Sequence, residues 1–160
     1  MLTRSRFVLL VAALFLAACA SAPAAPSPSN VRQIVSTTSF GMCVGYCTTR
    51  LEISPGRAVL VRQARGGRGA PQGLPDQRFA AGLTSEEWDA FAALAANTDL
   101  SGLPSVIGCP DCADGGAESL TIEGNGQPQT VTFEFNASIA QAAPLLERVR
   151  ALRTRLTPAK

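Results

Sequence analysis

Two turn signals divide the body of the chain into hairpins. Pro55-Gly56 and Gly124-Asn125-Gly126 each lie between runs in which apolar and polar residues alternate. A period of two is typical of strands with one buried face, and Gly-Asn-Gly is a strong signal for a tight turn. The sequence therefore predicts two β-hairpins and a strand that precedes them. The expected strands are 31–36, 48–53, 57–63, 119–123 and 130–135, and residues 78–81 are a candidate for one more short strand.

Helix signals flank the second hairpin. Thr84 and Glu87 stand three residues apart before an apolar stripe, and such a pair forms a capping box in which each side chain accepts from the other residue's backbone amide. The pattern predicts a helix over 84–97 with Trp88 on its buried face. Pro144 suits the first turn of a second helix. The apolar face of that helix holds Leu145, Val149, Leu152 and Leu156.

The order of these elements predicts an α+β fold. We expect a single antiparallel sheet of four to five strands with two helices packed on one face, which makes a two-layer domain. A chain of 160 residues has room for one such domain. It is expected to span residues 31–157, after a signal peptide at 1–18 and a tether at 19–30.

The N-terminal residues are typical of an exported protein. A basic leader precedes an apolar stretch at 7–17, which is shorter than the ~20 residues of a membrane span. The sequence that follows, Leu16-Ala17-Ala18-Cys19, resembles the lipobox of bacterial lipoproteins, in which cleavage leaves a lipid-modified Cys as the new N-terminus. The resemblance implies that Cys19 carries acyl chains such as palmitate and inserts them into the lipid bilayer. An ordinary secretory cleavage, after Ala22 for instance, is the alternative.

The residues after Cys19 indicate where the protein is sorted. Ala20 rather than Asp follows the lipidated position, and the sorting rule for such lipoproteins then implies the outer membrane of the bacterial envelope, facing the periplasm. Residues 20–30 are rich in Pro, Ser and Ala. This composition predicts a semi-extended tether that holds the domain away from the bilayer.

Charge is segregated along a neutral mature chain. Removal of Arg4 and Arg6 leaves 12 of the 14 basic residues, which balance the 12 acidic ones. Residues 32–78 carry a net +5, residues 79–147 a net −10 with neither Lys nor Arg, and residues 148–160 a net +5. Blocks of opposite charge predict a fold in which the basic and acidic parts of the chain complement each other. Nucleic acid is not expected as a partner, because aromatic residues are not interleaved with the Arg residues.

An even number of cysteines follows the proposed lipid anchor. Cys43 and Cys47 lie in C-V-G-Y-C, and Cys109 and Cys112 lie in C-P-D-C. An even count in an exported protein predicts disulfide bonds. Three connectivities are possible; bridges between the motifs would constrain the unfolded chain more, whereas proximity during oxidation favours bonds within each motif. We expect the pairs Cys43–Cys47 and Cys109–Cys112.

Two other uses of these cysteines stay open. C-P-D-C has redox-motif spacing, so a thiol–disulfide oxidoreductase that uses Cys109 and Cys112 is one alternative. Four cysteines could also hold zinc, although an oxidising compartment competes for the thiolates. Asp111, Asp114 and Glu118 could bind Ca²⁺, but their spacing matches no EF-hand, so a turn with solvated acids is favoured. No metal or other cofactor is therefore expected.

The first cysteine motif also carries a family resemblance. Phe40-Gly41-Met42-Cys43-Val44-Gly45-Tyr46-Cys47, with the hairpin turn at Pro55-Gly56, resembles a domain-of-unknown-function family of bacterial envelope proteins. Their signature is a C-x-G-x-C turn leading into a β-hairpin, then a capped helix and a second hairpin. The resemblance covers roughly residues 31–156 in element order. It implies the fold and no activity.

The side chains available disfavour catalysis. His is absent, which excludes Ser-His-Asp triads, Cys-His dyads and imidazole metal sites, and Lys160 is the sole Lys. No catalytic residue is assigned. We expect a lipid-anchored periplasmic protein that is a non-enzymatic binding or structural module, with another envelope protein as its partner.

Overall fold

The structure is a computed structural model that describes residues 30–65 and 73–158. The expected signal peptide, Cys19 and nearly all of the expected tether lie outside these residues. Among the helices of the described part, none is long and apolar enough to cross a membrane. The strands are β1 (Val31–Ser39), β2 (Gly45–Ser54), β3 (Arg57–Arg65), β4 (Gln77–Gly82), β5 (Val106–Ile107), β6 (Ala117–Gly124) and β7 (Gln129–Glu134). The helices are α1 (Ser85–Ala96) and α2 (Ala143–Leu156), with short 3₁₀ turns η2 (Cys112–Asp114) and η3 (Ala140–Ala142).

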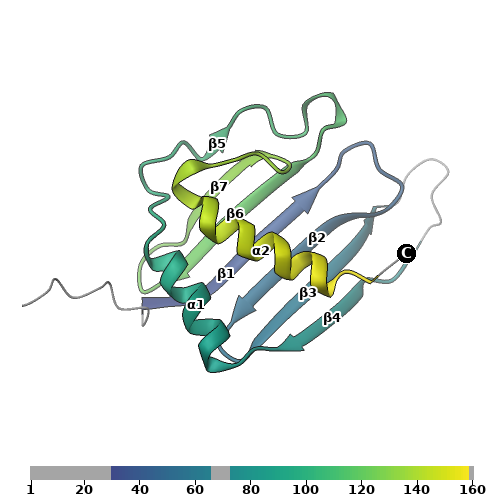
Figure 1. Cartoon of the computed structure of the whole chain (residues 1–160). Coiled ribbons are helices and arrows are strands. Elements are labelled where there is room, and N and C mark those ends of the chain that lie inside the picture. Colours follow the sequence, from purple (N-terminus) through teal and green to yellow (C-terminus); the bar gives the residue numbers. More distant parts are fainter. Residues whose placement is uncertain (1–29, 66–72, 159–160) are drawn as a thin grey trace, which may run out of the picture.

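The strands form one mixed sheet of seven, in the order β4-β3-β2-β1-β6-β7-β5 (Figure 1). The expectation of an all-antiparallel sheet of four to five strands is therefore wrong. β5 pairs in parallel with β7 through Val106 and Ile107. Two residues are too few to show an alternating pattern, and their pairing depends on a strand far along the chain, so local sequence carried no signal for it.

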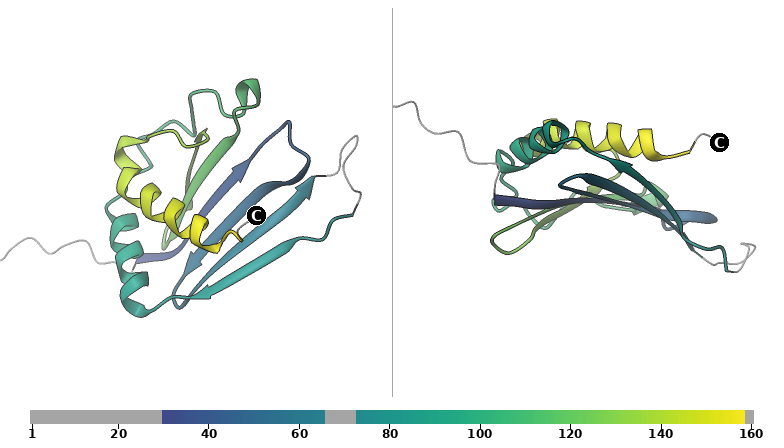
Figure 2. Two further views of the ribbon diagram at one scale, coloured as in Figure 1. Left: turned by 45° about the vertical axis from the view of Figure 1, so that its right-hand side comes forward. Right: turned by 90° about the horizontal axis from the view of Figure 1, so that it is seen from below.

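Both helices cover the same face of the sheet, as expected (Figure 2). Alternate residues of the central strands meet beneath them, as where Ile34 lies opposite both Ile53 and Ile122. Thr84 and Glu87 form the predicted capping box at the start of α1, and Trp88 is buried in the core. These two local predictions are confirmed.

The sheet has two distinct ends. At one end, the first residue of β1, Val31, pairs with Gly124 of β6. At the other end, Ser39 pairs with Thr48 of β2 and Ala117 of β6. The chain therefore enters the sheet at one end of β1, and the loops that precede β2 and β6 both lie at the opposite end. Nine residues of strand separate the two ends by about 27 Å.

Candidate functional site

The two cysteine motifs lie together at the end of the sheet remote from Val31. We call the loop residues 40–47 and 108–116 the disulfide tip. The first loop joins β1 to β2 and the second joins β5 to β6, so neighbouring strands bring them side by side. No sequence spacing indicated this, because about sixty residues separate the two motifs.

Each motif pairs its own cysteines at disulfide distance. The Cα atoms of Cys43 and Cys47 are 5.5 Å apart, and those of Cys109 and Cys112 are 5.4 Å apart. Both separations suit disulfide bonds, which supports the expectation that the chain contains them. The surroundings of the pairs differ, because Cys47 is buried whereas Cys109 and Cys112 are both exposed.

The two loops of the tip contact each other directly. The backbone N–H of Gly41 donates to Asp111 Oδ1 at 3.0 Å. The Phe40 and Phe135 rings meet edge to face, 4.9 Å between centroids. Gly116 lies beneath the Phe40 ring, where a Cβ atom would overlap ring carbons, and its φ of +83° also favours glycine. The disulfide tip is therefore one packed unit rather than two independent loops.

The surface of the tip combines exposed apolar side chains with carboxylates. Met42 is 79% exposed and Val44 is 67% exposed, on either side of Cys43. Glu134 Oε1 accepts from the backbone N–H of Cys109 at 3.0 Å. Beside it lies a hollow of about 350 Å³, lined by Cys109, Cys112, Gly115, Gly116, Glu134 and Phe135. A short disulfide-bearing loop thus presents two apolar side chains to solvent.

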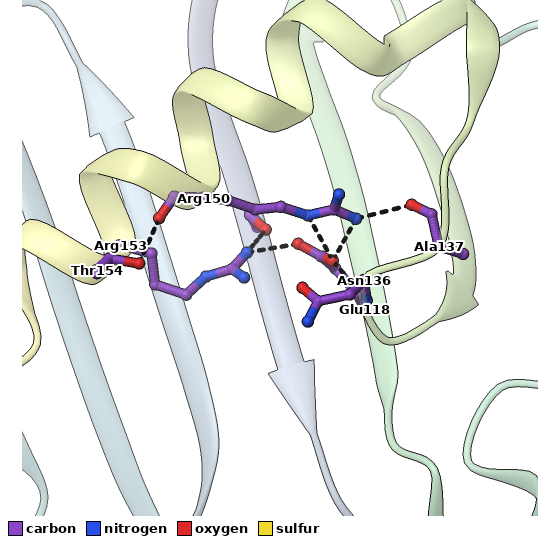
Figure 3. A network of polar contacts seen from close by, with 7 residues as sticks. Glu118, Asn136, Ala137, Arg150, Arg153 and Thr154 are labelled. Atoms are coloured by element: carbon purple, nitrogen blue, oxygen red, sulfur yellow. Dashed lines mark hydrogen bonds and ion pairs between the residues drawn. The ribbon is translucent and has the colours of Figure 1, made fainter.

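A buried ion cluster lies close to the tip, between the sheet and α2 (Figure 3). Glu118 of β6 is fully buried, and its Oε2 accepts from Arg150 Nε at 3.0 Å and from Arg150 Nη2 at 2.8 Å. Its Oε1 accepts from Arg153 Nη2 at 2.8 Å, and the same guanidinium donates to Ser36 Oγ. Arg150 also donates to the Ala137 carbonyl at 2.8 Å. These contacts join the acidic middle of the sequence to its basic C-terminal block, as the segregated charges predicted.

Opposing effects act on the pKa of Glu118. Burial raises it, but the hydrogen bonds and positive charges of Arg150 and Arg153 outweigh burial and hold the pKa below its ordinary value of 4.5. The carboxylate therefore stays ionised under the helix. One carboxylate faces two guanidinium groups, and Arg153 Nε is buried without a hydrogen-bond partner among the described residues.

The lowered pKa of Glu118 predicts a loss of stability in acid. The folded pKa lies below the unfolded one, so the contribution is complete above about pH 4.5 and declines as the pH falls towards the folded pKa. The free energy of unfolding, measured with urea and Trp88 fluorescence, should fall as the pH is lowered below about 4.5. Asp99, whose hydrogen bonds from Ser101 also lower its pKa, changes stability in the same direction. Glu118→Gln should flatten the profile relative to the wild-type protein, and an unchanged slope would contradict the prediction.

The alternative metal sites are not assembled in the described part of the chain. Within residues 30–65 and 73–158, no three side chains of His, Cys, Asp or Glu are grouped to hold a metal ion. The expectation that Glu118 is a solvated acid of a turn is wrong, since its side chain is buried under α2. The physical reason is strand register: β6 begins at Ala117, so Glu118 shares the inward face with Leu120 and Ile122.

Sequence reasoning missed the ion cluster as a unit. The alternation of Glu118, Leu120 and Ile122 was visible, but the strand was expected to begin one position after Glu118. Arg150 and Arg153 directly follow the buried Val149 and Leu152 in α2, so the helical period places them at the border of the apolar face. The signal that could have identified the cluster is an acidic residue at a position where strand alternation predicts an inward-facing apolar side chain.

No protein-family model and no curated protein matches the chain. The resemblance of the C-x-G-x-C segment to envelope proteins therefore stays a prediction.

Proposed function

We propose that the protein is a lipid-anchored, non-enzymatic protein of the bacterial envelope, and that its disulfide tip binds another envelope protein. In this proposal, acyl chains on Cys19 hold it to the outer membrane on the periplasmic side. The partner offers an apolar hollow for Met42 and Val44. Positively charged groups at the rim of that hollow would complement Asp111, Asp114 and Glu134.

One observation carries the proposal: the tip lies at the opposite end of the sheet from the point where the chain enters β1. A lipid anchor before Val31 would therefore direct the tip away from its own bilayer. β1 adds about 27 Å to the reach, and the eleven residues between Cys19 and Val31 add up to about 30 Å when extended. A binding surface placed there is available to periplasmic partners.

The composition of the tip supports binding rather than catalysis. Exposed large apolar side chains gather at protein interfaces, and Met in particular adapts to irregular apolar hollows. The loop that bears Met42 and Val44 is tied at both ends, since Phe40 N–H donates to the Cys47 carbonyl at 3.1 Å. A tied loop loses little conformational freedom on binding. The absence of His from the sequence also supports a non-enzymatic role.

Site-specific photocrosslinking in intact cells tests this proposal. A photoreactive amino acid at Met42 should give a discrete crosslinked partner, whereas the same group at Gln127 should not. Gln127 is exposed in the β6–β7 turn, at the end of the sheet where the chain enters. The Met42 crosslink should disappear when Val44→Asp is added, because a buried carboxylate would oppose docking.

Three results would refute the proposal. Equal crosslinks from both positions would indicate nonspecific contact. A Met42 crosslink that persists after Val44→Asp would show that Met42 and Val44 do not form an apolar docking surface. If the purified protein turns over a substrate, and a single polar substitution abolishes that turnover, the protein is an enzyme and the proposed non-enzymatic role is wrong.

A further inference from the structure

The disulfides of the tip differ in their access to solvent. Cys47 is 2% exposed and Cys43 is half-buried, whereas Cys109 and Cys112 are both exposed beside the hollow of about 350 Å³. Thiol–disulfide exchange requires an attacking thiolate to reach one sulfur of the bond. Both residues of the Cys109–Cys112 pair meet this requirement, whereas at the other pair only the half-buried Cys43 is partly accessible.

The backbone around the exposed pair also favours opening. Asp111, Ala113 and Asp114 have φ values of 60°, 51° and 60°, in the left-handed region that residues with a Cβ atom seldom occupy. Asp tolerates this region through its short polar side chain, but Ala113 has no such group. Asp111 lies inside the ring closed by Cys109 and Cys112, and Ala113 directly follows that ring. Opening of the ring therefore removes the closure that holds Asp111 in the left-handed region and lets the segment relax.

The exposed disulfide ring is hydrogen-bonded to the loop that bears Met42 and Val44. Asp111 lies inside the Cys109–Cys112 ring, and its Oδ1 accepts from the Gly41 N–H at 3.0 Å. The backbone N–H of Asp111 donates to the Gly116 carbonyl at 3.0 Å. Once the ring opens, Asp111 is free to leave the left-handed region and the contact to Gly41 is weakened. Gly41 directly precedes Met42, so the change reaches the proposed docking surface.

We infer that Cys109–Cys112 is a thiol–disulfide exchange site that accepts electrons from an exported dithiol, and that its reduction loosens the disulfide tip. An attacking thiolate forms a mixed disulfide with one of the two sulfurs, while the bond between them breaks and the leaving sulfur takes a proton. The second thiol of the dithiol then resolves the mixed disulfide. Two electrons and two protons pass to the protein, and the dithiol becomes a disulfide. The consequence for docking rests on the proposed function, but the exchange does not.

The charges around the pair make it a substrate of exchange rather than a catalyst. Asp111 and Asp114 lie in the loop, and Glu134 Oε1 contacts the Cys109 amide. Negative charges oppose the formation of a thiolate on the reduced pair, and the thiolate is the nucleophile in exchange. They also favour approach of a positively charged thiol. Cysteamine, which is positively charged, should therefore reduce the pair faster than the anionic mercaptoethanesulfonate. Added salt should narrow the difference between the two reduction rates.

Differential alkylation of the full exported protein tests the exchange site. The protein is titrated with dithiothreitol under native conditions, free thiols are alkylated, and trypsin releases each pair on a separate peptide. Cleavage after Arg32, Arg50, Arg78 and Arg148 yields residues 33–50 and 79–148. Cys109 and Cys112 should be labelled at a dithiothreitol concentration about tenfold lower than Cys43 and Cys47. Labelling of both pairs together, or of Cys43 and Cys47 first, would overturn the inference.

Amide hydrogen exchange at Gly41 tests the coupling between the loops. Selective reduction should speed exchange at this amide about tenfold, and Cys109→Ala with Cys112→Ala should give the same rate. Asp111→Ala should make exchange at Gly41 fast in both redox states. Asp111→Asn, which retains an acceptor oxygen and tolerates the left-handed region, should restore the redox dependence. An amide exchange rate at Gly41 that does not change when the wild-type protein is reduced would refute the coupling.

These measurements use the isolated protein and need no partner. Failure of the photocrosslinking therefore leaves the exchange result standing, and failure of the exchange leaves the docking surface standing. If both hold, reduction of Cys109–Cys112 should lower the crosslink yield from Met42 several-fold. An unchanged yield would show that the redox change does not regulate docking.

Discussion

Replacement of Glu118 by Gln should lower the free energy of unfolding by about 3 kcal/mol. The substitution keeps the size of the side chain but removes the negative charge that both Arg150 and Arg153 contact. Two guanidinium groups then remain under α2 with no carboxylate beside them, and Arg153 has a side chain that is 11% exposed. Thermal unfolding followed by Trp88 fluorescence should show a melting temperature lower by roughly 10 °C.

A matched variant and a compensated variant separate charge from packing. Glu123→Gln on the same strand should change stability by less than about 0.5 kcal/mol, because Glu123 faces away from the helices. Combining Glu118→Leu with Arg150→Met and Arg153→Met should recover most of the loss, since apolar replacement of a whole buried ion cluster is often neutral. A Glu118→Gln protein as stable as the wild type would show that the cluster does not stabilise the fold.

Replacement of Cys19 by Ser should abolish the mature, acylated form of the protein almost completely. If Cys19 carries the lipid, the variant has no acyl acceptor at that position and is not processed there, and any protein released by another peptidase should be soluble. Two or more acyl chains anchor a protein stably, whereas none leaves it free. Phase partitioning in detergent and mass spectrometry of the N-terminus measure both effects. The globular domain should keep its stability, because the predicted core begins at Val31.

The native protein provides the control for this substitution. Its mature N-terminus should be Cys19 with added acyl mass, and Ser21→Ala in the tether should leave processing and partitioning unchanged. An intact Met1, or a mature start elsewhere without acyl mass, would refute the lipoprotein prediction. The proposed orientation of the disulfide tip away from the bilayer would then lose its support.

Predictions from the sequence succeeded where the responsible forces act between near neighbours. The Pro55-Gly56 turn, the Thr84–Glu87 capping box and the buried face of α1 at Trp88 each depend on a few adjacent residues. Turn conformation, capping and helical periodicity are local properties, so a single sequence displays them. The charge blocks likewise predicted that acidic and basic parts would meet, without identifying Glu118 as the residue that meets them.

Predictions failed where residues distant in sequence had to be placed together. The two-residue β5 exists because β7 offers it a pairing edge, and two residues carry no pattern of their own. The number of strands was underestimated partly for this reason. Glu118 was assigned to a solvated turn because its burial depends on the register of β6 against β1 and on α2 crossing above it.

The sequence by itself determined the hairpins, the capped helix and the two closely spaced cysteine pairs, because each depends on neighbouring residues. The lipid-bearing leader stays a prediction. Tertiary structure alone decided that Cys43–Cys47 and Cys109–Cys112 form one tip, that this tip lies opposite the N-terminal end of β1, and that Glu118 is buried beside Arg150 and Arg153. The reason is strand order: β1 lies between β2 and β6, and this pairing brings loops seventy residues apart to the same end of the sheet. Such pairing is decided by burial of the whole apolar face, which no single segment contains.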